Sequence, residues 1–81
     1  MKKYKEKEIK KYVIADLSKN TNYLLSNGNG NYSFIDNIAV ATKFVSKKIA
    51  EEICSECIKV CDIDLVTVPI IITYEIINEL E

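Results

Sequence analysis

Apolar and polar residues alternate along much of this chain, and the alternation predicts short β-strands in the first half. Residues 12–17 (YVIADL) and residues 23–26 (YLLS) are rich in the β-branched and aromatic residues that strands favour. The polar segment 18–22 lies between them, and its serine and asparagine side chains bond their own backbone in turns. We therefore expect two antiparallel strands joined by that turn.

The next segment is less regular. Residues 27–31 (NGNGN) hold both glycines of the chain and predict a turn or loop. Residues 32–35 (YSFI) predict a further extended stretch, which residues 36–37 interrupt. Over residues 38–44 the pattern alternates again, and it favours a strand over a helical turn.

A period near 3.6 residues predicts one amphipathic helix after Ser46, which is a favourable N-cap residue. The residues Asp62 to Asp64 are expected to close the helix. Its expected apolar face holds seven residues, which are Ile49, Ala50, Ile53, Cys54, Cys57, Ile58 and Cys61.

The clearest strand pattern runs from Leu65 to Ile77 and predicts a long final strand. One face is apolar at every second residue, so we expect it to meet the helix while the other face is largely in water. Pro69 cannot donate to a ladder, so it marks an edge, a bulge or a bend. The face expected to meet the helix consists of Val66, Val68, Ile70, Ile72, Tyr74 and Ile76. Apolar residues on the other face form an expected partner or dimer surface, namely Leu65, Ile71 and Ile77.

These elements predict one α+β domain over residues 1–81, with the order β-β-β-α-β. An antiparallel sheet of three to four strands carries one amphipathic helix packed on one face. Residues 1–9 are charged and aperiodic, and we expect a flexible arm or a fraying strand there. No apolar run approaches the roughly 20 residues of a membrane span, and none follows the basic start, so we expect no membrane contact and a cytoplasmic location.

The net charge of −1 hides an asymmetry between the two ends of the chain. Residues 1–11 carry six lysines against two glutamates, a net charge of +4, whereas the remainder carries five lysines against ten acids, a net charge of −5. A basic segment on an acidic body points to nucleic acid or to an acidic partner, and the simpler interpretation is a solvated terminus. The acidic body repels phosphate and disfavours direct nucleic-acid binding.

The chain has no histidine, arginine or tryptophan, and it offers no nucleophile–base pair at a meaningful spacing, so we predict neither an enzyme nor a cofactor site. Three cysteines share the apolar face of the expected helix, at Cys54, Cys57 and Cys61. A zinc or iron–sulfur centre is the alternative, but structural zinc uses four ligands, usually from two segments. We therefore predict that the cysteines pack in the core as small apolar residues.

Residues 38–52 (IAVATKFVSKKIAEE), followed by residues 66–74 (VTVPIIITY), resemble small proteins of Firmicutes phages and mobile elements. The likeness lies in an A-x-x-F-x-S entry to an Ala/Glu helix and in a final strand near a Val-Pro pair, and it covers about a third of the chain. Some small phage proteins of this size act against host defences, anti-CRISPR inhibitors among them. The resemblance implies no particular site residues.

The resemblance implies a non-enzymatic protein that binds and inhibits a bacterial defence protein in the host cytoplasm. The candidate partner-binding residues are acids that would mimic nucleic acid, namely Glu51, Glu52, Glu56, Asp62 and Asp64. The alternative is a small-ligand binder, for example a sponge for a nucleotide signal, with its site at the seam of a homodimer.

Overall fold

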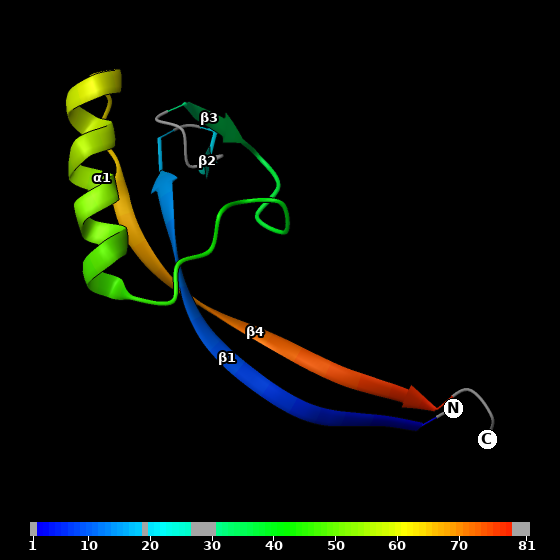
Figure 1. Cartoon of the computed structure of the whole chain (residues 1–81). Helices are drawn as coiled ribbons and strands as arrows, with labels where there is room; N and C mark the ends of the chain where they lie inside the picture. The colour runs from blue at the N-terminus through cyan, green and yellow to red at the C-terminus, as the bar shows by residue number, and fades with distance from the viewer. Residues whose placement is uncertain (1, 19, 27–30, 79–81) are drawn as a thin grey trace.

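The computed structural model describes residues 2–18, 20–26 and 31–78, and it has the α+β architecture that the sequence predicts (Figure 1). Four strands and one helix follow one another in the order β-β-β-α-β. The glycine-containing loop expected at residues 27–31 lies outside the described residues except for Asn31. The elements are β1 (Lys2–Asp16), β2 (Asn22–Ser26), β3 (Tyr32–Ile35), α1 (Lys47–Cys61) and β4 (Val66–Asn78).

The four strands form one antiparallel sheet in the order β3-β2-β1-β4. β4 is an edge strand, so of the three alternatives given for Pro69, an edge, a bulge or a bend, the structure shows the edge. β1 pairs with β4 along almost its whole length, from Lys2 opposite Asn78 to Ala15 opposite Val66, with a register shift between Lys5 and Lys7. In contrast, β2 pairs with β1 only at the last two residues of β1.

Because β2 accompanies only the end of β1, residues 2–11 of β1 and residues 70–78 of β4 leave the body as a two-stranded ribbon, which we call the arm (Figure 1). The molecule measures 53 Å along its longest axis, and its radius of gyration is 15.5 Å. A compact domain of this length has a radius of gyration of about 12 Å. Residues 2–9 were expected to be a flexible arm or a fraying strand. They lie in β1 and pair with β4, and their flexibility stays a prediction.

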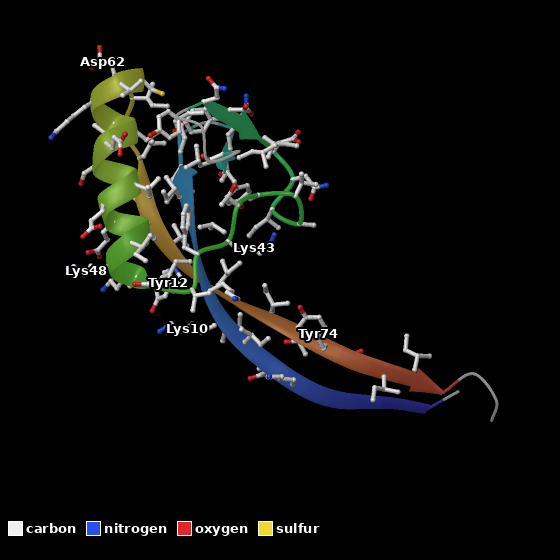
Figure 2. All side chains as sticks on the ribbon, viewed as in Figure 1. Lys10, Tyr12, Lys43, Lys48, Asp62 and Tyr74 are labelled. Atoms are coloured by element: carbon white, nitrogen blue, oxygen red, sulfur yellow. The ribbon has the colours of Figure 1, made fainter. Side chains whose placement is uncertain are left out.

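The strand predicted over residues 38–44 is wrong except at its end, because residues 38–41 form a turn and only Phe44 makes a β-bridge. Phe44 and Tyr12 exchange two backbone hydrogen bonds of 2.8 and 2.9 Å (Tyr12 is labelled in Figure 2). The Thr42 amide donates to the carbonyl of Leu24 at 3.0 Å. The physical reason is that β2 diverges from β1, and this connection satisfies the backbone groups that the divergence leaves open.

The helix begins and ends as the sequence predicts. The Ser46 hydroxyl accepts a hydrogen bond from the Ile49 amide at 3.3 Å, which is an N-cap contact. Asp62 ends α1 in the left-handed conformation, with φ of 55°, and its amide donates to the carbonyl of Ile58. Of the seven predicted core positions, Ile49 is the exception, because its side chain is 52% exposed.

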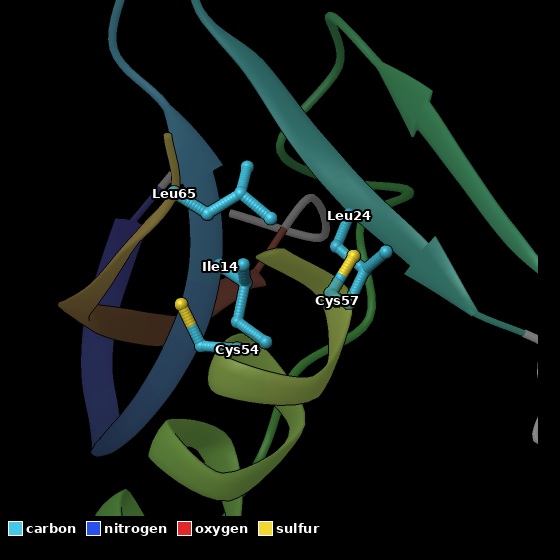
Figure 3. Close-up of a cluster of buried hydrophobic side chains, with 5 residues drawn as sticks. All are labelled: Ile14, Leu24, Cys54, Cys57 and Leu65. Carbon is cyan, nitrogen blue, oxygen red and sulfur yellow. The ribbon is translucent and has the colours of Figure 1, made fainter. Parts of the chain in front are cut away.

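The core lies between α1 and the body of the sheet (Figure 3). All three cysteines were predicted to pack in it; Cys54 and Cys57 are buried there, and the half-buried Cys61 packs against it. Tyr32, Phe34 and Phe44 are half-buried and pack against it. The buried cluster consists of Ile14, Leu24, Cys54, Cys57 and Leu65.

The face of β4 that we expected to meet the helix is the wrong one. Thr67 lies opposite Ile14 in the ladder, and opposed residues of an antiparallel pair point to the same side. Since Ile14 packs in the core with α1, the helix lies on the face of Thr67, and the apolar row that includes Val68 lies on the opposite face. Alternation identified the apolar row of β4 but could not show what covers it. Val13, which lies opposite Val68 on the same face, is fully buried although α1 lies on the other face.

We predict that truncating Leu24, which is fully buried, lowers the free energy of unfolding far more than truncating the exposed helix residue Ile49. Leu24→Ala should cost about 2–5 kcal/mol because it leaves a cavity, and Ile49→Ala should cost less than about 1 kcal/mol. Denaturant unfolding followed by circular dichroism measures both values. Equal losses for the two variants would contradict the position of the core.

Candidate functional site

The most unusual surface of the molecule is on the arm, where β4 exposes large apolar side chains. Ile71 is 67% exposed, Tyr74 53%, Ile76 52% and Ile77 47%. No helix covers the arm in the part of the chain that the structure describes (Figure 1). A monomeric protein rarely gathers this many large apolar side chains on an uncovered element, so the arm is a candidate binding surface. We call the arm patch the residues Ile70, Ile71, Ile72, Tyr74, Ile76 and Ile77.

The ladder register divides the arm patch between the two faces of the ribbon. Ile72 lies opposite Ile9, and Tyr74 lies opposite Lys7, so these four residues share one face. The other face carries Ile71 opposite Lys10. Figure 2 shows the side chains of Lys10 and Tyr74 on different sides of the ribbon, as this register requires.

An open hollow lies where the arm meets the turn before Phe44. Its volume is about 530 Å³, within the size range of ligand pockets. The ammonium group of Lys43 donates to the carbonyl oxygens of Ala39 and Ala41 at 2.9 and 3.0 Å, so this cation holds the turn together. The residues that line the hollow are Ile38, Ala39, Lys43, Ile70, Ile71, Ile72 and Tyr74.

The acids predicted to bind a partner are all exposed, but they do not form a surface of a single charge. The three glutamates lie on α1, Asp62 caps its C-terminus, and Asp64 lies in the connection to β4. Lys47 is 3.8 Å from Glu51, and Lys59 lies in the last turn of the helix. The five acids are Glu51, Glu52, Glu56, Asp62 and Asp64.

One of these acids also acts on a neighbouring strand. The pKa of Tyr32 is raised, first by partial burial of the phenol and then by the Glu56 carboxylate, whose negative charge and hydrogen bond both favour the neutral phenol. Glu56 of α1 is therefore close enough to Tyr32 of β3 to affect its ionisation.

The cysteines have the environment of core residues. Cys54 and Cys57 are buried, and the sulfur of Cys57 lies 3.8 Å from that of the half-buried Cys61. Burial, followed by the hydrogen bond and charge of Cys61, raises the pKa of Cys57 to about 12. Among the described residues, no group of three or more histidine, cysteine or acidic side chains is placed to hold a metal ion.

The sequence identified only part of the arm patch. Ile71 and Ile77 are exposed as expected, whereas Leu65, predicted to be exposed with them, is buried in the core. Tyr74 and Ile76 were wrongly expected to lie under the helix. A usable signal was element length, because 15 helical residues span about 22 Å and 13 strand residues about 43 Å, so the helix cannot cover the whole strand.

The comparisons with known proteins give no relative for this fold. No family model matches the chain, and neither the curated proteins nor the solved structures contain a match. Within the described residues, α1 is too short and not apolar enough to cross a membrane.

We predict that the three cysteines react with an alkylating agent in an order set by burial. At pH 8 Cys61 should react first, while Cys57 should be protected because its side chain is fully buried and its pKa of about 12 leaves almost no thiolate. Mass spectrometry of partly labelled protein measures the order, and labelling in denaturant is the control in which all three react. Slow labelling of all three thiols upon addition of Zn²⁺ would contradict the core assignment.

Proposed function

We propose that this chain is a non-enzymatic protein that binds and inhibits a bacterial defence protein, as anti-CRISPR proteins do, and that it binds through the arm patch. The observation that carries the proposal is the exposure of Ile71, Tyr74 and Ile76, each at least half in water on a ribbon that leaves the body. The resemblance of residues 38–52 and 66–74 to small phage proteins supplies the class of target.

The chemistry of the arm patch defines the kind of target surface. Tyrosine is enriched at the energetic centres of interfaces, because a large rigid ring buries much area at little entropic cost. Exposed lysines of β1, such as Lys7 and Lys10, flank the patch. The fitting surface is therefore apolar with an acidic rim.

The carboxylates of α1 are a second proposed contact. They would mimic the phosphates of nucleic acid against a basic protein surface, as the sequence suggested. The pairing of Lys47 with Glu51 and the position of Lys59 reduce the negative potential of this surface. We therefore assign the larger share of the binding energy to the arm patch.

The test compares two matched variants. In one, Ile71 and Tyr74 are changed to serine, and in the other Glu51, Glu52 and Glu56 are changed to glutamine. Each protein is expressed in bacteria that carry a defined CRISPR–Cas or restriction system, and phage plating efficiency is measured together with affinity capture of the defence protein.

The wild-type chain should raise plating efficiency and retain one defence protein at stoichiometry. The gain in plating efficiency should be at least tenfold smaller for the serine variant than for the wild-type chain. For the glutamine variant it should differ from the wild type by no more than about threefold, because hot-spot residues carry most of the energy of an interface. Loss in the glutamine variant alone would assign binding to α1. The inhibitor proposal fails if no system is relieved and no defence protein is retained.

One observation favours the alternative of a small-ligand binder, namely the apolar hollow of about 530 Å³ beside Tyr74. Against a nucleotide, the Lys43 ammonium is already bonded to two carbonyl oxygens. We predict that native mass spectrometry of the chain mixed with cyclic and linear nucleotides shows no complex. A one-to-one complex that Tyr74→Ser abolishes, while Glu52→Gln retains it, would replace the inhibitor with the sponge.

A further inference from the structure

We infer that the outer edge of β4 in the arm pairs with the same edge of a second copy of this chain, so that two arms join into one four-stranded ribbon. The inference does not depend on the proposed function, because it concerns how the arm itself is completed. A two-stranded ribbon alone is at best marginally stable in water, and further strands stabilise it.

The backbone directions identify which groups of β4 face outward. Both backbone groups of Tyr12 bond to Phe44, so they point away from β4. Backbone groups alternate in direction along a strand, so Pro69, which lies opposite Tyr12, also points outward and its missing N–H costs no bond to β1. By the same alternation, the N–H and C=O groups of Ile71, Thr73 and Glu75 point outward. Within residues 2–18, 20–26 and 31–78, no strand pairs with that edge.

The two edges of the arm differ in how well they are protected against pairing. Lysines and bulges are the usual means by which natural sheets block an edge. The β1 segment of the arm, residues 2–11, has six lysines and a register shift between Lys5 and Lys7. The β4 segment, residues 70–78, has one charged residue, Glu75, and no lysine. The β4 edge is therefore the one open to a further strand.

A second copy fits this edge because the segment is complementary to itself. When Tyr74 lies opposite the partner's Tyr74, Ile72 lies opposite the partner's Ile76 and Ile71 opposite the partner's Ile77. Thr73 then lies opposite the partner's Glu75, and apolar residues meet apolar residues on both faces. The outward groups of Ile71 to Ile77 form about eight hydrogen bonds in this register.

The charge of Glu75 selects this register over its neighbours. With Thr73 opposite the partner's Thr73, Glu75 would lie opposite the partner's Ile71, so a carboxylate would face an apolar side chain at each end. With Glu75 opposite the partner's Glu75, two carboxylates would repel each other. In the chosen register the two lysine-rich β1 strands lie on the outside, with both β4 strands between them.

The test is the mass of the full chain in solution, measured by sedimentation equilibrium over a range of micromolar concentrations. We expect twice the chain mass of 9.2 kDa. Thr73→Pro removes an outward N–H and leaves the bonds to β1 intact, so it should weaken the dimer at least tenfold. The matched control Thr73→Val keeps that N–H and should remain a dimer. Circular dichroism checks that each variant is folded.

Hydrogen exchange on the wild-type chain decides the matter without any variant. The amides of Ile71, Thr73 and Glu75 should be protected at high concentration and should exchange faster on dilution, whereas the inward amides of Ile70 and Ile72 should change less. A wild-type chain that remains a monomer overturns the inference. A dimer in which the outward amides exchange freely also overturns it, because its contact is elsewhere.

Discussion

The pairing of β1 with β4 is the interaction on which the rest of the molecule depends. The ladder joins the two ends of the described chain, from Lys2 opposite Asn78 to Ala15 opposite Val66. At one end it places Ile14 beneath α1, and at the other it continues as the arm with no third layer. The same continuous ladder therefore creates both the core and the exposed apolar surface. Only the part of the ladder that contains Ile14 receives support from the helix, because α1 is about half as long as β4.

Local sequence signals predicted the elements well and their assembly less well. The cap at Ser46, the stop at Asp62 and the helical period of the cysteines are properties of neighbouring residues, and the structure confirms them. The strand predicted at residues 38–44 was wrong because that segment fills the gap between β1 and β2, which is a tertiary feature. Which face of β4 meets the helix depended on the register with β1, and no pattern within β4 contains that information.

In the candidate site, too, local features were predictable from the sequence and tertiary features were not. The exposure of the α1 carboxylates was predictable, because acids on the polar side of an amphipathic helix face water. Tyr74 and Ile76 were not identified because their alternation is the same whether a helix covers them or not. The arm patch and the β4 edge are separate properties of one element, since side chains form the first and backbone groups the second. A target that binds the patch can therefore be compatible with two arms paired along the edge.

The register of the arm is the central claim, and contacts between α-protons of β1 and β4 measure it most directly. Lys10 opposite Ile71 and Glu8 opposite Thr73 continue the alternation set by Tyr12 and Pro69. In each pair the backbones of the two opposed residues therefore do not bond each other, and the two Cα atoms lie about 4.5 Å apart. Nuclear Overhauser spectra should show a strong cross-peak between the α-protons of each pair. Absence of both cross-peaks, with random-coil shifts for residues 2–11, would contradict a continuous ladder and with it the arm.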